Sequence, residues 1–447
     1  MAKKKQIELT IEEKLQNALV PKEEQPYKIP SNWCWTYIHN IAIVVTGKTP
    51  SKKNKEYYGG KFPFFKPADL DAGRNMQYAT EYLSEKGKSI SVIIPEKATG
   101  ICCIGTIGKC GYFLVEGTTN QQINTVISKI NPLYSYYFFN TNSFVRELIS
   151  KASATTIAIV NKSKLESCLF PVAPLNEQQR IVNRIESLFA KLDKAKELIE
   201  NTLAQFEQNK MAILHKAFTG ELTAKWRKEN NIDLSSWEKI KLGKVLLPMQ
   251  TKKPTGQFFR YIDIDAIDNK RQIVKAPKLI LTEKAPSRAS RGVETGNILF
   301  SMVRPYLKNI AQIDSDLSDC IASTGFYVCR CKPELNSRFL YYLFIFDKTI
   351  DYLMQFMKGD NSPSIRKDDL LNMKIDLPTI EEQQEIVNIL DKLLAKYNKI
   401  KNLEQQLEKI ELLKKAILAK AFRGELGTNN PDEESAENLL KEILAEK

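Results

Sequence analysis

Two long segments of the chain carry apolar residues in steps of three and four, which is the spacing of a coiled-coil seam. In the first, no proline or glycine lies between Glu177 and Phe218, and the seam reads Ile181, Ile185, Leu188, Leu192, Ala195, Ile199, Leu203 and Phe206. In the second, the seam reads Ile386, Leu390, Leu393, Tyr397, Ile400, Leu403, Leu407, Ile410 and Ile417. A glycine follows each segment, at Gly220 and Gly424, as is common after a helix. The pattern predicts two helices of about 40 residues, each roughly 60 Å long.

The two segments are copies of each other. The sequence PLNEQQRIV at 174–182 returns as PTIEEQQEIV at 378–387, and KAFTGEL at 216–222 returns as KAFRGEL at 420–426. The offset is 204 at the proline and at Lys-Ala-Phe, and 205 at Glu-Gln-Gln. Because each helix follows a block of similar length, the repeat predicts antiparallel pairing of the helices and a pseudo-two-fold molecule.

The blocks before each helix have the shorter alternations of mixed helix and sheet. β-branched runs bounded by turn residues predict strands at 41–46, 89–94, 124–130, 296–303 and 325–331. Each block closes with a helical pattern, at 134–151 and 337–358. Further helices are predicted at Glu8–Leu19 and from Ser435 onward. The predicted fold class is α+β, with two mixed α/β domains joined by two long antiparallel coiled-coil helices.

Composition narrows the function classes. A length of 447 residues predicts two or three domains, and no apolar run reaches the ~20 residues of a membrane span. The first ten residues lack the apolar core of a secretory signal, so the expected location is the reducing cytoplasm. Only two histidines are present, and the eight cysteines form no C-x-x-C pair. We therefore expect buried thiols, no metal site and no cofactor.

The net positive charge of the chain lies in the two blocks. Residues 31–170 hold 16 lysines and arginines against 9 acidic residues, and residues 235–377 hold 23 against 16. Each block therefore carries an excess of +7, within a total of +13. Two separate basic modules are typical of a protein that contacts a polyanion at two places.

Three patterns suggest chemistry, and each has a structural alternative. Residues 42–49 fit a loose phosphate-binding pattern, but a β-branched strand runs directly into Pro50. Asn131-Pro-Leu-Tyr134 resembles the base-holding loop of adenine methyltransferases without its second proline, and helix initiation explains it equally. Asp263, Asp265 and Asp268, with Lys270, could ligate a nuclease metal or form a solvated turn.

Residues suited to DNA contact are more numerous. Basic loops occur early in each block at 47–53 and 251–253, and amide or hydroxyl side chains follow at 118–123 and 323–325. Such side chains read base edges, and lysines position phosphates. The predicted DNA-binding residues are Lys48, Thr49, Ser51, Lys52, Lys53, Lys66, Lys109, Asn120, Gln121, Gln122, Lys252, Lys253, Arg260, Arg304, Lys308, Ser323, Thr324 and Arg366.

The chain resembles the specificity subunit of a type I restriction–modification system. The resemblance is carried by the Glu-Gln-Gln helix starts, the Lys-Ala-Phe-x-Gly-Glu-Leu helix ends, Gly47-Lys-Thr-Pro-Ser51, Gly105-Thr-Ile-Gly-Lys109, Pro30-Ser-Asn-Trp33, Ala18-Leu-Val-Pro21 and Glu434-Ser-Ala436. The second block departs from the pattern, with Arg304-Pro-Tyr-Leu-Lys308 in place of the glycine turn.

The resemblance implies a domain order and a set of partners. It implies an N-terminal helical segment (1–28), a target-recognition domain (29–173), a central spacer helix (174–230), a second target-recognition domain (231–377), a distal spacer helix (378–430) and an acidic tail (431–447). Each recognition domain would read one half of a split site in double-stranded DNA. The helices would set the spacing and dock two methyltransferase subunits and, through them, restriction/translocase subunits.

The implied docking residues are Glu177, Gln178, Gln179, Phe218, Glu382, Gln383, Gln384 and Phe422. The chain itself would be non-catalytic, since adenine methylation and ATP-dependent cleavage would belong to the complex. Two alternatives stay open on the residues alone. One is a single-chain DNA methyltransferase or nuclease, and the other is a non-catalytic DNA-binding regulator.

Overall fold

The structure is a computed structural model that describes residues 9–153, 158–395 and 400–446. The chain divides into two compact units. Unit 1 comprises Met1–Leu198 and Gln405–Lys447, and unit 2 comprises Ile199–Glu404. The 44-residue helix α7 (Leu175–Phe218) begins in unit 1 and ends in unit 2. The first predicted helix is therefore confirmed.

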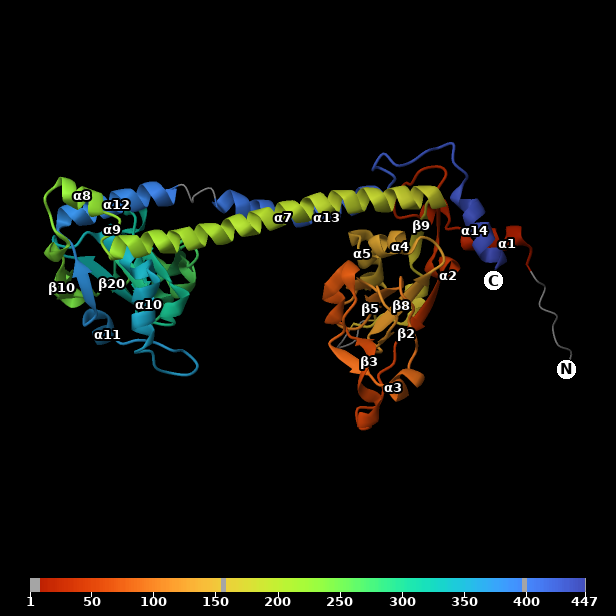
Figure 1. The fold of residues 1–447 in the computed structure, drawn as a ribbon, viewed down its shortest axis with the longest axis horizontal. Helices are drawn as coiled ribbons and strands as arrows, with labels where there is room; N and C mark the ends of the chain where they lie inside the picture. The colour runs from red at the N-terminus through yellow and green to blue at the C-terminus, as the bar shows by residue number, and fades with distance from the viewer. Residues whose placement is uncertain (1–8, 154–157, 396–399, 447) are drawn as a thin grey trace. The chain divides into compact units, whose positions relative to one another are not determined.

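Unit 1 combines short strands with helices on one side. Its helices are α1 (Ile11–Ala18), α2 (Ile38–Ile41), α3 (Glu85–Ser89), α4 (Pro132–Phe139), α5 (Asn142–Ser150), α6 (Lys162–Glu166), the start of α7, most of α13 (Ile400–Ala421) and α14 (Ala436–Ala445). Its strands are β1 (Cys34–Tyr37), β2 (Ala42–Thr46), β3 (Tyr58–Phe65), β4 (Glu81–Leu83), β5 (Thr99–Cys102), β6 (Cys110–Tyr112), β7 (Thr118–Thr119), β8 (Ile123–Ser128) and β9 (Leu169–Val172). They form sheets in the orders β2-β8-β5-β6, β4-β3-β7 and β1-β9. Helices α4 and α5 lie between α7 and the first of these sheets, and β3 and α3 lie at the far end (Figure 1).

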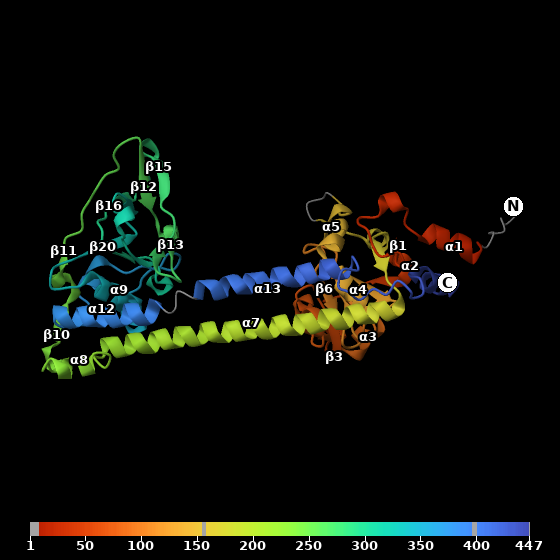
Figure 2. The same cartoon turned by 90° about the horizontal axis from the view of Figure 1, so that it is seen from above.

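Unit 2 repeats this arrangement. Its helices are the end of α7, α8 (Ala224–Glu229), α9 (Ser337–Ile345), α10 (Asp347–Met354), α11 (Lys367–Leu371), α12 (Ile380–Ala395) and the start of α13. Its strands are β10 (Glu238–Lys241), β11 (Leu246–Leu247), β12 (Phe258–Ile262), β13 (Ile267–Asp268), β14 (Ile273–Val274), β15 (Lys278–Leu281), β16 (Ala289–Gly292), β17 (Ile298–Ser301), β18 (Ile310–Gln312), β19 (Ile321–Ser323), β20 (Phe326–Cys331) and β21 (Lys374–Leu377). Their sheets have the orders β11-β20-β17-β18, β15-β12-β19-β16, β10-β21 and β13-β14. Strands β12, β15 and β16 lie on the side of the unit away from α7 (Figure 2).

The sheets of the two units correspond strand by strand. In unit 1, β3 pairs in parallel with β7, and in unit 2, β12 pairs in parallel with β19. The antiparallel pair β1–β9 likewise corresponds to β10–β21. The predicted internal repeat is therefore present in the fold as well as in the helices.

The long helices pack against each other within each unit. In unit 1, Lys196 lies 3.3 Å from Glu411, and Lys414 lies 2.5 Å from Asp193, so α7 and α13 run antiparallel there. In unit 2, Leu214 of α7 and Leu390 of α12 are fully buried in one apolar core. The predicted antiparallel pairing is thus confirmed.

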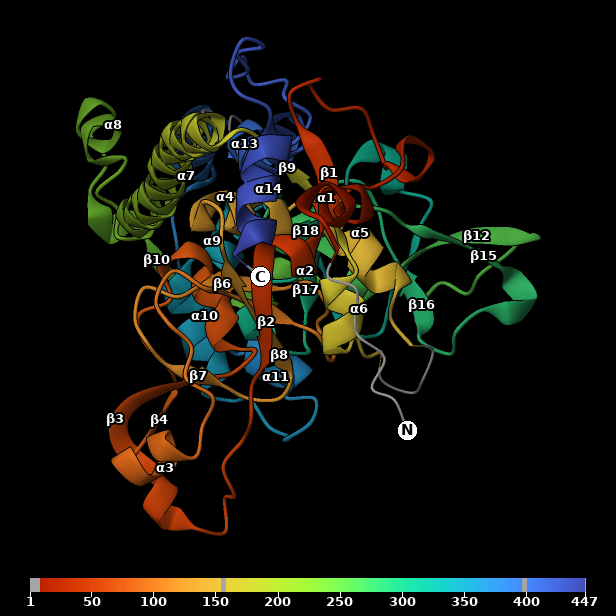
Figure 3. The same ribbon diagram turned by 90° about the vertical axis from the view of Figure 1, so that its right-hand side faces the viewer.

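The chain termini pack together in unit 1. Leu15 of α1 and Leu440 of α14 are buried in one apolar core, and Lys441 contacts Glu12 at 2.9 Å. Figure 3 shows α1 and α14 side by side. Ser435 caps α14, as the sequence predicts for a helix that starts there.

Some predicted elements differ from the structure. The predicted strand at 89–94 is wrong, because only Ile94 is paired there, in a single bridge to Gly117. The predicted second helix is described as α12 and α13, and the irregular seam at Tyr397 lies outside the described residues. The closing helix of each block is in fact two helices, α4 with α5 and α9 with α10.

The block of each unit is held to its long helix by a buried glutamine. In unit 1, Gln178 donates to the Ala173 carbonyl at 2.8 Å and accepts from the Asn131 N–H at 3.0 Å. In unit 2, Gln383 makes the same bridge to Pro378 and Asn336. The repeated glutamine therefore satisfies backbone groups where the block meets the helix.

Exchange of Gln178 for alanine tests this role. Because the part-buried Asn131 N–H and the buried Ala173 carbonyl would both be left without their side-chain partner, we expect Gln178→Ala to lower the free energy of unfolding by about 1–3 kcal/mol. Gln179 is the matched control, since it is exposed and bonds only to Asn131 and Asn183 side chains. Gln179→Ala should change stability by less than about 0.5 kcal/mol. Equal effects in denaturant unfolding would contradict the assignment.

Candidate nucleic-acid interface

Two loops of unit 1 meet beyond the end of β2. The Gly47 N–H donates to the Ile123 carbonyl at 3.2 Å, and the Lys48 N–H donates to the Thr119 carbonyl at 2.9 Å. Thr49 donates its hydroxyl to the Gln121 side chain at 2.5 Å. The structure therefore brings together two loops that were predicted separately, 47–53 and 118–123.

The glycine turn at 105–109 joins the same group of loops. Cys102 N–H donates to the Lys109 carbonyl, and Cys103 N–H donates to the Gln122 carbonyl, both at 2.8 Å. Within the 118–123 loop, Asn120 donates its side-chain amide to Gln122 at 2.9 Å. The amides at 120–122 therefore sit in a fixed network beside exposed lysines.

Gly47 is required by this close packing. A Cβ at this position would lie 2.2 Å from the Asn120 carbonyl oxygen, and that oxygen belongs to backbone. We expect Gly47→Ala to lower the free energy of unfolding by about 1–3 kcal/mol and to separate the two loops. The neighbouring Lys48→Ala, at an exposed position, should leave stability unchanged. Hydrogen exchange at the Lys48 N–H in Gly47→Ala measures the loop separation, and unchanged protection would contradict it.

Unit 2 gathers a corresponding set of loops. The Lys252 N–H donates to the Ser290 carbonyl at 3.1 Å, and the Thr324 N–H donates to the Arg288 carbonyl at 2.9 Å. Ser323 is buried, and its hydroxyl accepts a hydrogen bond from the Gly325 N–H at 3.3 Å. The predicted segments 251–253 and 323–325 are therefore linked through β16 and the loop before it.

Arg288 and Arg291 lie in this group, and the sequence analysis did not single them out. Arg288 is exposed, and Arg291 is half-buried on β16, which pairs with β19. In the part of the chain that the structure describes, neither arginine forms an ion pair, and Arg291 Nε is buried without a hydrogen-bond partner. Only the strand pairing places them beside Ser323, so no local pattern could have indicated them.

A small cavity of about 270 Å³ also brings predicted residues together in unit 2. Its lining includes Lys252, Arg260 and the half-exposed ring of Phe258. Arg260 is already bonded to Asp319 at 2.8 Å. Lys252 is therefore the more available cation at this cavity.

Fourteen of the eighteen predicted DNA-binding residues fall into two groups, and the other four are half-buried or buried, namely Thr49, Gln122, Asn120 and Ser323. Lys48, Ser51, Lys52, Lys53, Lys252, Lys253, Arg304, Thr324 and Arg366 are exposed, and Gln121 is exposed beside them. Lys66, Lys109, Arg260 and Lys308 are held in ion pairs with Glu81, Asp71, Asp319 and Asp347, respectively. A DNA phosphate could contact the ion-paired side chains only by replacing their carboxylate partners. The exposed residues are therefore better placed for direct contact with DNA.

The other candidate chemistry has structural explanations. Asn131 caps α4 by accepting from the Leu133 and Tyr134 N–H groups, and Asn336 caps α9 in the same way. Asp268 accepts the Lys270 and Arg271 N–H groups in a turn, and Asp265 pairs with Lys278. These contacts favour helix initiation and a solvated turn over a catalytic loop or a metal site.

The cysteines behave as predicted. All eight are free, and seven are buried. Burial raises the pKa of the Cys34 thiol to about 12, and the charge of Glu437 makes a smaller contribution in the same direction. The thiol is therefore protonated at neutral pH. Within residues 9–153, 158–395 and 400–446, no group of three potential ligands could hold a metal ion.

The predicted docking residues divide by burial. Glu177, Gln178, Glu382 and Gln383 are fully buried, and Phe422 is 1% exposed. Each glutamate accepts a hydrogen bond from a tryptophan indole, Glu177 from Trp33 at 2.7 Å and Glu382 from Trp237 at 2.9 Å. We therefore assign these side chains an internal role, and the docking prediction is kept for the exposed Gln179 and Gln384 and for the half-buried Phe218.

Comparison with known proteins agrees with this geometry. The family model described as the type I restriction modification DNA specificity domain matches the chain twice, over residues 30–204 and 237–412. The two matches together span more than half of the chain. The chain belongs to this family. Each match covers one block with the helix that follows it, which is the repeat found in the sequence and in the fold.

Curated relatives extend the similarity over almost the whole specificity subunit. The chain is 23% identical to the type I restriction enzyme EcoDI specificity subunit of Escherichia coli, over 94% of this chain and 96% of that protein. It is 24% identical to the StySPI specificity subunit of Salmonella potsdam over the same shares. It is 27% identical to the EcoBI specificity subunit of Escherichia coli, over 73% and 75%.

Solved structures share the fold. A chain from a study of complex assembly and conformational transition in a type I restriction–modification system superposes with a TM-score of 0.68 at 20% identity, covering 90% of this chain and all of that one. The HsdS subunit from Thermoanaerobacter tengcongensis superposes with a TM-score of 0.53 at 21% identity, with the same coverage. The chain is thus a type I specificity subunit, which is the DNA-recognition component of its system and not a catalytic one. Among the described residues of this subunit, no helix has the length and hydropathy to cross a membrane.

Proposed function

We propose that each unit of this specificity subunit reads one half of a bipartite double-stranded DNA site. The observation that carries the proposal is that, in each unit, a loop with basic side chains lies beside a loop with amide or hydroxyl side chains. Exposed lysines at 48–53 flank the 120–122 amides in unit 1, and Lys252, Arg288 and Thr324 come together in unit 2. Lysines would hold phosphates, and the amides and arginines would read base edges.

We propose further that the long helices dock two methyltransferase subunits, through which restriction/translocase subunits join the complex. The seam residues Leu188 and Leu192 are only half-buried, since two helices alone cannot enclose them. Leu412 and Leu413 of α13 are 64% and 49% exposed. Apolar side chains left open on a coiled coil favour further helices packing against it.

Binding to a DNA library tests the proposal. The purified chain, alone and with the methyltransferase subunit of the same operon, is offered random duplexes, and bound sequences are read. We expect two short specified sequences separated by an unspecified gap, enriched more strongly by the complex. A single undivided motif, or bound DNA without sequence preference, would contradict the assignment and favour a different DNA-binding regulator.

A further inference from the structure

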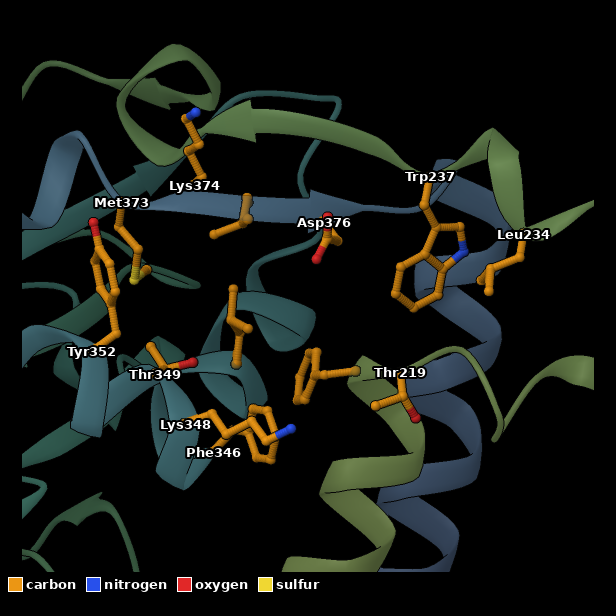
Figure 4. Close-up of a pocket in the computed structure, with 13 residues that line it drawn as sticks. Thr219, Leu234, Trp237, Phe346, Lys348, Thr349, Tyr352, Met373, Lys374 and Asp376 are labelled. Carbon is orange, nitrogen blue, oxygen red and sulfur yellow. The ribbon is translucent and has the colours of Figure 1, made fainter.

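Unit 2 contains a cavity of about 600 Å³ beside β10 and β21 (Figure 4). Its wall is mainly apolar and includes Phe218, Trp237, Leu343, Phe346 and Met373. Lys348, Lys374 and Asp376 stand at the rim, from α10 and β21. The cavity is not part of the loop groups assigned to DNA.

The internal repeat identifies the same place in unit 1. The helix-end phenylalanines Phe218 and Phe422 correspond, as do Trp237 and Trp33, which bond to equivalent buried glutamates. At the same offset of 204, Thr219 of the cavity wall corresponds to Arg423, and at the offset of 205 that relates Asn336 to Asn131, Tyr352 corresponds to Glu147. The wall of the cavity can therefore be followed residue by residue in unit 1.

In unit 1 this place is filled by Tyr27. Its ring packs edge-on against Trp35 with 4.9 Å between ring centroids, and the Arg423 guanidinium lies 5.5 Å from the ring. Burial raises the pKa of the Tyr27 phenol, the charge of Arg423 opposes this, and the charge of Glu147 adds to it. Arg423, the counterpart of the cavity residue Thr219, thus lies against the Tyr27 ring.

Both aromatic rings are missing from unit 2. At the 204-residue offset, Asn231 stands in place of Tyr27, and Lys239 stands in place of Trp35. Asn231 has a left-handed backbone (φ 56°) and is exposed, and Lys239, with 70% of its side chain exposed, pairs with the rim residue Asp376 at 3.6 Å. The replacement of two rings by polar side chains accounts for an apolar cavity at this position.

The backbone beside the cavity also differs between the two units. In unit 1, the segment that carries Tyr27 begins along β1, where the Val20 N–H donates to the Trp35 carbonyl at 3.0 Å and Leu19 bridges Thr36. In unit 2, among the described residues, β10 pairs only with β21. An edge strand with unpaired backbone groups can accept an added extended segment.

We propose that the unit 2 cavity and the β10 edge bind an extended segment of a partner protein that places a tyrosine ring in the cavity. The occupant in the other copy is a tyrosine that follows a strand-paired segment (Leu19 and Val20) and a 3-10 turn (Lys22–Glu24), and the cavity keeps the counterparts of Trp33 and Phe422, which belong to the core cluster against which that tyrosine packs. Lys348 and Lys374, both exposed at the rim, favour acidic residues beside that tyrosine. The unit 1 segment has this composition, since Glu23 and Glu24 lie three and four residues before Tyr27.

A peptide of residues 19–27 of this chain serves as the probe, because it carries the β-pairing residues, the two glutamates and Tyr27. Titration of the labelled peptide into the full chain is expected to give saturable binding. Exchange of tyrosine for alanine in the peptide should weaken binding about tenfold, which is the effect of removing a buried aromatic anchor. Replacement of the peptide tyrosine by photoreactive benzoylphenylalanine should give crosslinks to 218–219, 343–352 or 373–376.

Variants of the chain test the rim without disturbing the core. We expect the double variant Lys348→Glu and Lys374→Glu to weaken peptide binding about tenfold, since both charges beside the acidic residues are reversed. The matched control is Lys358→Glu with Lys367→Glu, which makes the same change of net charge at exposed positions outside the cavity wall. Circular dichroism establishes that all variants are folded.

Three results would overturn the proposal. They are the absence of peptide binding, binding that is indifferent to the tyrosine, and crosslinks confined to Trp35 and Arg423. The third result would mean that the peptide merely displaces its own copy in unit 1. Binding of the chain to a second copy of itself through the cavity, seen as a dimer that the peptide dissociates, would also contradict a heterologous partner.

Discussion

Replacement of Arg227 by alanine is expected to lower the free energy of unfolding of unit 2 by about 3–5 kcal/mol, which is the usual cost of breaking a buried ion pair from one side. Arg227 is 7% exposed, and its guanidinium lies 2.5 Å from the carboxylate of Glu382, which is fully buried. Thr223 and Trp237 also donate to that carboxylate. Without Arg227, the charge of Glu382 would remain buried with neutral donors alone.

A second pair of variants isolates the charge. Lys225 lies on the same short helix with 89% of its side chain exposed, so Lys225→Ala should change the stability by less than about 0.5 kcal/mol. The double variant Arg227→Met with Glu382→Gln should recover part of the stability, because no uncompensated charge is left inside. Denaturant unfolding followed by tryptophan fluorescence measures all three. Equal stability of Arg227→Ala and Lys225→Ala would show that the ion pair between Arg227 of α8 and Glu382 of α12 does not stabilise unit 2.

The other large effect is expected on DNA affinity. Reversal of Lys48, Lys52 and Lys53 to glutamate removes three exposed cations from one loop of unit 1. We expect DNA binding to weaken roughly 100-fold, and the slope of log affinity against log salt to fall by about 3, one for each phosphate that a lysine no longer neutralises. Because lysines position phosphates, the affinity for the whole site should fall without a change in the preferred sequence of either half.

The control for this triple variant keeps the same charge change elsewhere in unit 1. Lys22, Lys28 and Lys420 are exposed on the terminal segments and at the end of α13. Their reversal to glutamate should weaken binding only through the net charge, with a smaller decrease in affinity and a nearly unchanged salt slope. If both triple variants weaken binding equally, the 47–53 loop is not a phosphate-contacting element.

The helices could be predicted because their signal is local. The absence of proline and glycine from Glu177 to Phe218, together with the three-four spacing, predicted α7 to within a few residues. Ser435 predicted α14 for the same reason, since a capping side chain acts on its own helix. The strand predicted at 89–94 failed because a β-branched run becomes a strand only where another strand pairs with it.

The sites were predicted less completely, because they depend on contacts between distant residues. Arg288 and Arg291 come beside Ser323 through the pairing of β16 with β19, and no local pattern encodes that register. Glu177 and Glu382 were predicted at a docking surface, yet each is buried beneath a tryptophan from about 145 residues earlier in the chain. A repeated polar motif indicates that a position matters, and burial decides whether its role is internal or external.

The most direct test of the central claim is a genome-wide map of N6-methyladenine in cells that carry this subunit and its methyltransferase partner. The account predicts a bipartite motif that disappears when the subunit is deleted. In cells with the Arg288→Ala, Arg291→Ala variant, one half of the motif should become degenerate while the other half and the gap stay fixed. An undivided motif, or degeneracy in both halves, would contradict the assignment of one half-site to each unit.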